Sequence, residues 1–128
     1  MRELTSHRVN GLNEAIDIHV MDEPGQGGAC HEYYLSVGRE PFVGPGCSPV
    51  VSQSIKFQNG PIKEFGVNGI SQEALLAVVE DRLVSFQAGP FACRENAIAL
   101  TRVQDAMHWL MHRTRQRMAR NVEGTSTK

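Results

Sequence analysis

Four arginines crowd into one short stretch of the chain, at Arg113, Arg115, Arg117 and Arg120, and no acidic residue interrupts the run. A guanidinium group is planar and can donate two parallel hydrogen bonds to a phosphate or a carboxylate. The whole chain has a formal net charge of -1, so its positive charge is local rather than spread over the molecule. Nucleic-acid-binding domains are usually basic overall, and this pattern therefore favours a compact anionic ligand.

The arginines fall on a helix predicted from about Arg94 to Arg120. At about 100° per residue, three of the four share a broad sector, and Arg115 lies nearly opposite. Basic residues near the end of a helix also complement its dipole, at about 0.3 to 1 kcal/mol each, so a solvated arginine face is the alternative interpretation. The shared sector contains Arg102, Ala106, Trp109, Arg113, Arg117 and Arg120.

Two further side chains could complete a nucleotide site. Phe86, near the end of a first helix, could stack on a base, although the residues alone favour core packing for this side chain. Asn96 could hydrogen-bond to a base edge or a ribose. Asn96 and Arg113 are, however, roughly 25 Å apart along one helix at 1.5 Å per residue. If they share a site, a second copy of the chain must supply half of it, which predicts an antiparallel dimer or a larger assembly.

The 128 residues are predicted to form a single α+β domain. Residues 1–67 are β-rich and predict a small antiparallel sheet, residues 70–120 predict an antiparallel two-helix hairpin, and residues 121–128 form a tail expected to fray. The chain is expected to oligomerise through the hairpin.

Local patterns give the boundaries of these elements. Alternating apolar residues predict strands over 15–22 and 31–37, and a Pro- and Gly-rich loop follows at 38–50. Residues 51–67 predict a β-hairpin that turns at Asn59-Gly60. Ser71 is the predicted N-cap of the first helix, which Gly89-Pro90 ends.

Other chemistry has little support in the sequence. His108 and His112 are spaced to share a metal ion, but no third ligand is indicated, and a solvated or stacked pair is the simpler interpretation. Cys93 has no evident partner base, and no catalytic motif is present, so we expect no catalytic residue, no metal and no cofactor. Three scattered cysteines and the absence of a long apolar stretch predict a protein of a reducing cytoplasm that does not bind membranes.

The segment "FQAGPFACRENAIALTRVQDAMHWLMHRTRQR" (86–117), with "FQNGPIKE" upstream, resembles the helical hairpin of two groups of bacteriophage anti-defence sponges. One is the Thoeris anti-defence group, for which the resemblance covers about residues 10–124. The other comprises the anti-CBASS cyclic-oligonucleotide sponges, which share mainly the hairpin. The strings "GPFACREN" and "HWLxHRTR" are unusual and occur in the expected order.

This resemblance implies binding without catalysis, in the cytoplasm of the host bacterium. Members sequester cyclic ADP-ribose isomers unhydrolysed, some also bind cyclic di- or trinucleotides at separate sites, and they form homodimers or homohexamers. Matched by position, Phe86 would stack on adenine and Asn96 would make a polar contact, while Arg113 and Arg117 would grip the pyrophosphate. Charge and placement alone add two further candidate ligand contacts, Arg94 and Arg120.

A different class of function also fits the arginine face. A small phage regulator or packaging accessory could use it on a DNA or RNA backbone, with binding that weakens steeply as salt increases. The resemblance favours a sponge, and no nucleic-acid partner is expected.

Overall fold

The computed structural model describes residues 2–37 and 51–128, so the predicted loop at 38–50 lies outside the described residues. The chain divides into two compact units. The first comprises Met1–Gly60 and Val67–Gly69, and the second comprises Pro61–Gly66 and Ile70–Lys128. A sheet forms the first unit and a helical hairpin dominates the second, which confirms the predicted α+β class.

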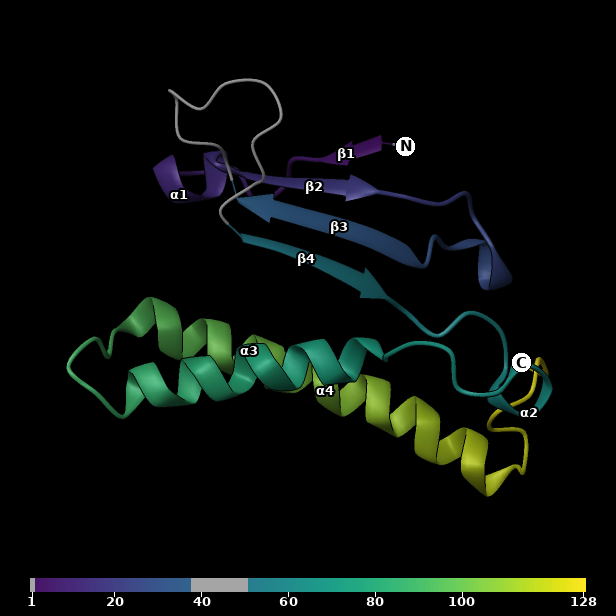
Figure 1. Ribbon diagram of the computed structural model, residues 1–128. Coiled ribbons are helices and arrows are strands. Elements are labelled where there is room, and N and C mark those ends of the chain that lie inside the picture. The colour runs from purple at the N-terminus through teal and green to yellow at the C-terminus, as the bar shows by residue number, and fades with distance from the viewer. Residues whose placement is uncertain (1, 38–50) are drawn as a thin grey trace. The chain divides into compact units, whose positions relative to one another are not determined.

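The first unit is built on an antiparallel sheet with strand order β1-β2-β3-β4 (Figure 1). Its centre is β2 (Ile16–Val20) beside β3 (Glu32–Val37), where Ile18 lies opposite Leu35. These two strands confirm the predicted runs, because alternating apolar residues leave one face of each strand for a core. The other elements of this unit are β1 (Arg2–Leu4), α1 (Gly11–Glu14), the 3₁₀ turn η1 (Gln26–Gly28) and β4 (Val51–Lys56).

The core of the sheet unit is small. Val20 is only 1% exposed, and the ring of Tyr33 meets that of Phe57 edge to face at 5.7 Å between centroids. At one end, the side chain of Arg8 pairs with the carboxylates of Glu3 and Asp17. The antiparallel backbone ladders hold the strands together, and the packing of these rings and the ion pairs of Arg8 add to them.

The β-hairpin predicted at Asn59-Gly60 is wrong in its second arm. β4 ends at Lys56, and the chain beyond Gly60 forms the one-turn helix α2 (Ile62–Phe65) instead of a strand. Pro61 precedes that helix with φ -64° and has no N–H to donate to a ladder, which favours a helix start over a strand. Asn59 is used differently, because its backbone N–H and C=O both bond to the side chain of Asn68 at 2.8 Å.

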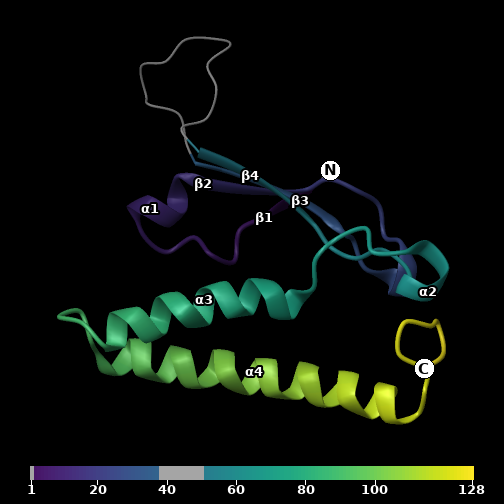
Figure 2. The same ribbon diagram turned by 60° about the horizontal axis from the view of Figure 1, so that its bottom comes forward.

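The second unit is an antiparallel hairpin of α3 (Gln72–Gln87) and α4 (Arg94–Ala119) (Figure 2). The Ser71 hydroxyl accepts a hydrogen bond from the Ala74 N–H at 3.1 Å, which confirms the predicted N-cap. Within α4 the most buried apolar residue is Met107, at 9% exposure. One continuous 26-residue helix carries Arg113, Arg115 and Arg117, and Arg120 is its C-cap.

Candidate functional site

The arginines at the C-terminal end of α4 differ in their exposure and in their hydrogen bonds. Arg113 is exposed and makes no hydrogen bond or ion pair with any residue that the structure describes. Arg115, two residues on, is exposed and equally free within the described chain. A free guanidinium on a rigid helix keeps all five of its N–H donors for a ligand. Arg113 therefore has the availability that a phosphate contact requires, and Arg115 provides a matched position on another side of the helix.

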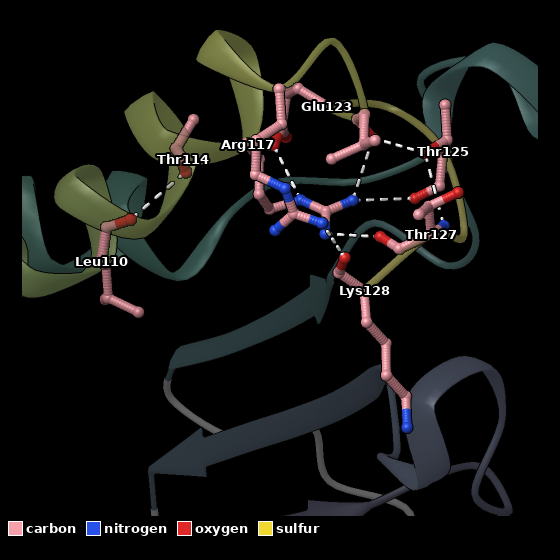
Figure 3. A network of polar contacts seen from close by, with 9 residues as sticks. Leu110, Thr114, Arg117, Glu123, Thr125, Thr127 and Lys128 are labelled. Carbon is pink, nitrogen blue, oxygen red and sulfur yellow. Dashed lines mark hydrogen bonds and ion pairs between the residues drawn. The ribbon is translucent and has the colours of Figure 1, made fainter.

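Arg117 is enclosed instead of free. Its side chain is only 10% exposed, and its Nε donates to the Glu123 carboxylate at 3.0 Å (Figure 3). Nη1 donates to the Thr127 carbonyl at 2.6 Å, and Nη2 donates to the carbonyls of Val122 and Thr125 at 3.0 Å each. The predicted pyrophosphate contact thus holds the C-terminal tail in this structure, and the tail that the sequence predicts to fray is folded back over α4.

Arg120 takes part in the same arrangement. One of its Nη atoms donates to the carbonyl of Lys128, although the side chain remains exposed. Both Arg117 and Arg120 lie where the helix dipole is negative, which stabilises positive charge at this end. Of the three clustered arginines that share this sector, Arg113 alone has no hydrogen bond or ion pair within the described part of the chain.

The turn end of the hairpin carries the other predicted residues. Phe86 is half-buried on α3, with the guanidinium carbon of Arg82 5.0 Å from its ring centre and the ring of Phe91 at 6.5 Å, edge to face. A cation above an aromatic ring is attracted to its electron-rich face. The ring is partly exposed, but the Arg82 guanidinium lies over one of its faces, where a base would otherwise stack.

Asn96 lies in the first turn of α4. Its backbone N–H donates to the Sγ atom of Cys93 at 3.4 Å, which makes Cys93 the N-cap of the helix. The Asn96 side chain is half-buried and has no polar partner among the described residues. The exposed Cys93 thiol therefore serves as a cap, and the Asn96 amide is available to a ligand.

Arg94 begins α4 and borders a shallow depression of about 260 Å³. Arg102 lies at the far side of the depression, 3.7 Å from the Asp105 carboxylate, and Ile98 lies between the two arginines. Arg94 thus lies at the first turn of α4, next to the connection with α3 and away from the arginine-rich end of the helix.

The structure leaves the predicted residues in two groups. Phe86, Arg94 and Asn96 lie at the turn end of the hairpin, whereas Arg113 and Arg117 lie near the opposite end of α4. The separation of about 25 Å along the helix remains, because α4 is continuous between Asn96 and Arg113. A single chain therefore does not bring the two halves of the predicted site together.

An aromatic cluster precedes Arg113 on α4 and was not among the predicted site residues. Trp109 is 66% exposed, and His108 and His112 meet its ring edge to face at 5.3 and 5.7 Å. The two imidazoles stack on each other at 6.2 Å. The sequence indicated this aromatic cluster only through Trp109, which falls in the same helical sector as Arg113 and Arg117. Glu123, the partner of Arg117, had no such signal because it follows the end of the helix.

A larger depression of about 490 Å³ lies in the sheet unit, between Arg2 and the loop that holds Asp22. Desolvation raises the pKa of Asp22, but hydrogen bonds from the N–H groups of His31 and Glu32 outweigh it, so the pKa lies below its ordinary value. The N–H of His31 lies 2.9 Å from the carboxylate. Asp22 therefore stabilises the loop between two strands, a role that explains it without a ligand.

Within residues 2–37 and 51–128, no three His, Cys, Asp or Glu side chains gather as a metal site. No helix of that part of the chain is long and apolar enough to span a bilayer.

A small antiparallel sheet followed by a two-helix hairpin, with arginines at the far end of its second helix, defines a class of α+β proteins built around a helical hairpin. Residues 50–115 match the family described as "Acb2/Tad1, hairpin domain". The match covers just over half of the chain, and the chain belongs to this family.

A relative supports the same placement and confirms the resemblance. The protein "Thoeris anti-defense 1" of Bacillus phage SBSphiJ7 is 48% identical over 75 residues, or 59% of this chain and 53% of the relative. The match thus spans about half the length of that curated relative. The family match ends at Arg115, so Arg117, Arg120 and the tail that encloses Arg117 lie beyond the matched residues.

Proposed function

We propose that the chain is a phage anti-defence protein that binds a cyclic ADP-ribose isomer and sequesters it, unhydrolysed, in the cytoplasm of the infected bacterium. Membership of the Acb2/Tad1 hairpin family and the relative's name support the anti-defence role. The observation that carries the ligand proposal is Arg113, an exposed guanidinium without a partner in the described chain, on the rigid helix of the family's hairpin. It offers two parallel donors to a pyrophosphate.

The site is completed by a second copy of the chain. Phe86 and Asn96 supply the base and ribose contacts, and they lie too far from Arg113 to act on the same small ligand within one chain. An antiparallel pairing of two hairpins places the arginine end of one copy against the turn end of the other. The protein therefore binds as a homodimer, or as a homohexamer built from dimers.

Apolar side chains that the hairpin leaves exposed support this assembly. Val78 on α3 is 67% exposed and Trp109 on α4 is 66% exposed, and Phe91 in the connecting turn is 71% exposed. Exposed apolar residues of this size on adjoining elements are typical of an interface with another chain. A second hairpin would cover them.

Sequestration is tested by mixing the purified protein with a panel of cyclic ADP-ribose isomers and cyclic di- and trinucleotides, followed by removal of the protein. We expect depletion of a cyclic ADP-ribose isomer, and return of the intact nucleotide when the protein is heat-denatured. A cleaved nucleotide on chromatography would identify an enzyme instead. The panel includes cyclic oligonucleotides because some members of the resembling groups bind them at separate sites.

The solution mass and the salt dependence complete the test. We expect a dimer or a hexamer by light scattering, and a strictly monomeric protein would contradict the shared site. Binding to DNA or RNA that becomes stronger with polymer length and weakens steeply with salt would favour the nucleic-acid accessory instead. No mobility shift at moderate salt would remove that alternative.

A further inference from the structure

Residues 122–128 of the C-terminal tail supply the acceptors for the Arg117 guanidinium, which the proposed pyrophosphate would also use. Four hydrogen bonds run from Arg117 to the tail, one to the Glu123 carboxylate and three to backbone carbonyls. A guanidinium has five N–H donors, so only one is left over. A bidentate grip on a phosphate needs two parallel donors. The enclosed Arg117 therefore cannot hold the tail and grip a phosphate in this way at the same time.

The tail presents the same chemistry as the ligand. A carboxylate and several carbonyl oxygens converge on one cation, as phosphate oxygens would (Figure 3). The pair of Arg117 and Glu123 also cancels the positive charge that would attract an anion. Arg113, one turn earlier on the helix, is left without such a partner in the described chain.

The folded tail is anchored at points other than Arg117. Gly124 has φ +80°, and a Cβ atom added there would lie 2.9 Å from Cγ1 of Ile62. The Gly124 carbonyl accepts from the N–H of Lys63 at 3.0 Å, and the Ser126 hydroxyl donates to the Glu64 carboxylate at 3.1 Å. Only glycine fits this position without strain. The tail is therefore seated on α2 by contacts that Arg117 does not make.

We propose that the tail is an autoinhibitory segment, in which Glu123 and the neighbouring carbonyls compete with the anionic ligand for Arg117. This inference rests on the proposed function, because it assigns Arg117 to the same ligand. In the free protein the tail holds Arg117, and the phosphate group binds fully only when the tail has been released. If release occurs in about one molecule in ten, the apparent Kd is about tenfold higher than that of a protein without the tail.

Three variants test this competition by calorimetric titration with a cyclic ADP-ribose isomer. They are a chain ended after Asn121, Glu123→Gln, and Gly124→Ala, which strains the seat of the tail without altering Arg117. We expect tighter binding for all three, up to about tenfold for the shortened chain. In the shortened chain, Arg117→Ala is expected to remove the increase in affinity. In the full chain the same substitution is expected to weaken binding by a smaller factor than it does in the shortened chain. Arg115→Ala is the matched control and is expected to change neither.

Hydrogen exchange supplies a readout that does not require the shortened chain to fold. Bound nucleotide is expected to speed amide exchange at residues 122–128 of the unmodified protein. Exchange in the tail that stays unchanged or becomes slower would overturn the inference. Binding by the shortened chain that is unchanged or weaker would overturn it as well. In either case the proposed function stands if the unmodified protein still binds the nucleotide. If neither the full nor the shortened chain binds any nucleotide of the panel, the proposed function and the inference both fail.

Discussion

Three neighbouring arginines of α4 are expected to give three different results when each is replaced by alanine. Arg113 is free and exposed, so Arg113→Ala is expected to leave the free energy of unfolding within about 0.5 kcal/mol of the unmodified protein. It removes a charge-assisted contact with the phosphate, worth about 1.5 to 3 kcal/mol, and is expected to raise the Kd about 10- to 150-fold. Arg115→Ala removes the same charge and is expected to change neither quantity.

Arg117→Ala is expected to lower stability as well, because the side chain is only 10% exposed and holds the tail through four hydrogen bonds. Loss of these bonds is expected to lower the free energy of unfolding by about 1 to 3 kcal/mol, since Glu123 is 40% exposed and regains water. For a chain of this size that corresponds to roughly 4 °C in Tm per kcal/mol.

Calorimetric titration and thermal melts of the three variants, at one salt concentration, separate these outcomes. If Arg113→Ala and Arg115→Ala weakened binding equally, the effect would come from net charge and not from a directed contact. The assignment of Arg113 to the phosphate would then be refuted. A melting temperature of Arg117→Ala equal to that of Arg115→Ala would refute the argument that the tail is held by this residue.

Three further predictions follow from other parts of the chain. Gly69→Ala places a Cβ 2.4 Å from the backbone of Phe57 and is expected to lower the free energy of unfolding by about 1 to 3 kcal/mol in chemical denaturation. Gly11 has open space around it, so Gly11→Ala is the control and is expected to leave stability unchanged. Equal effects of the two substitutions would refute the close approach at Gly69. The pKa of Asp22 is lower in the folded state, so its contribution to stability is present above pH 5 or so and is lost as the pH falls below about 4. Asp22→Asn is expected to remove that part of the acid sensitivity in melts across this range, and an unchanged pH profile would contradict the role of its backbone contacts. Trp109, the single tryptophan, is 66% exposed, and its emission is expected to shift to shorter wavelength as rising concentration assembles the hairpins, whereas a constant emission maximum would exclude this face from the interface.

Strong local signals made most of the fold predictable. Ser71 caps α3 as expected, and the strands at Ile16–Val20 and Glu32–Val37 follow their alternating pattern. The three-residue strand β1 is too short to show any period. The second arm of the predicted β-hairpin is wrong because Pro61 has no N–H for a strand ladder and its φ of -64° favours the start of a helix.

The candidate site was predictable in its residue types and less so in their environments. Helical periodicity placed Arg113 and Arg117 on one broad sector but gave no sign that one is free and the other enclosed. Three of the four acceptors of Arg117 are backbone carbonyls, and any residue can supply a carbonyl. Their convergence depends on the left-handed backbone of Gly124, which the sequence shows only as one more glycine.

The way in which α2 supports the end of the chain limits how the hairpin can be transplanted. The second unit includes Pro61–Gly66, separated in sequence from the rest by three residues of the first unit. A fragment cut at Ile70 would keep both long helices but lose the Lys63 amide and the Ile62 side chain against which Gly124 rests. A chimera with a relative's sheet should therefore be joined ahead of Pro61, so that α2 remains in the same fragment as Gly124, which it supports.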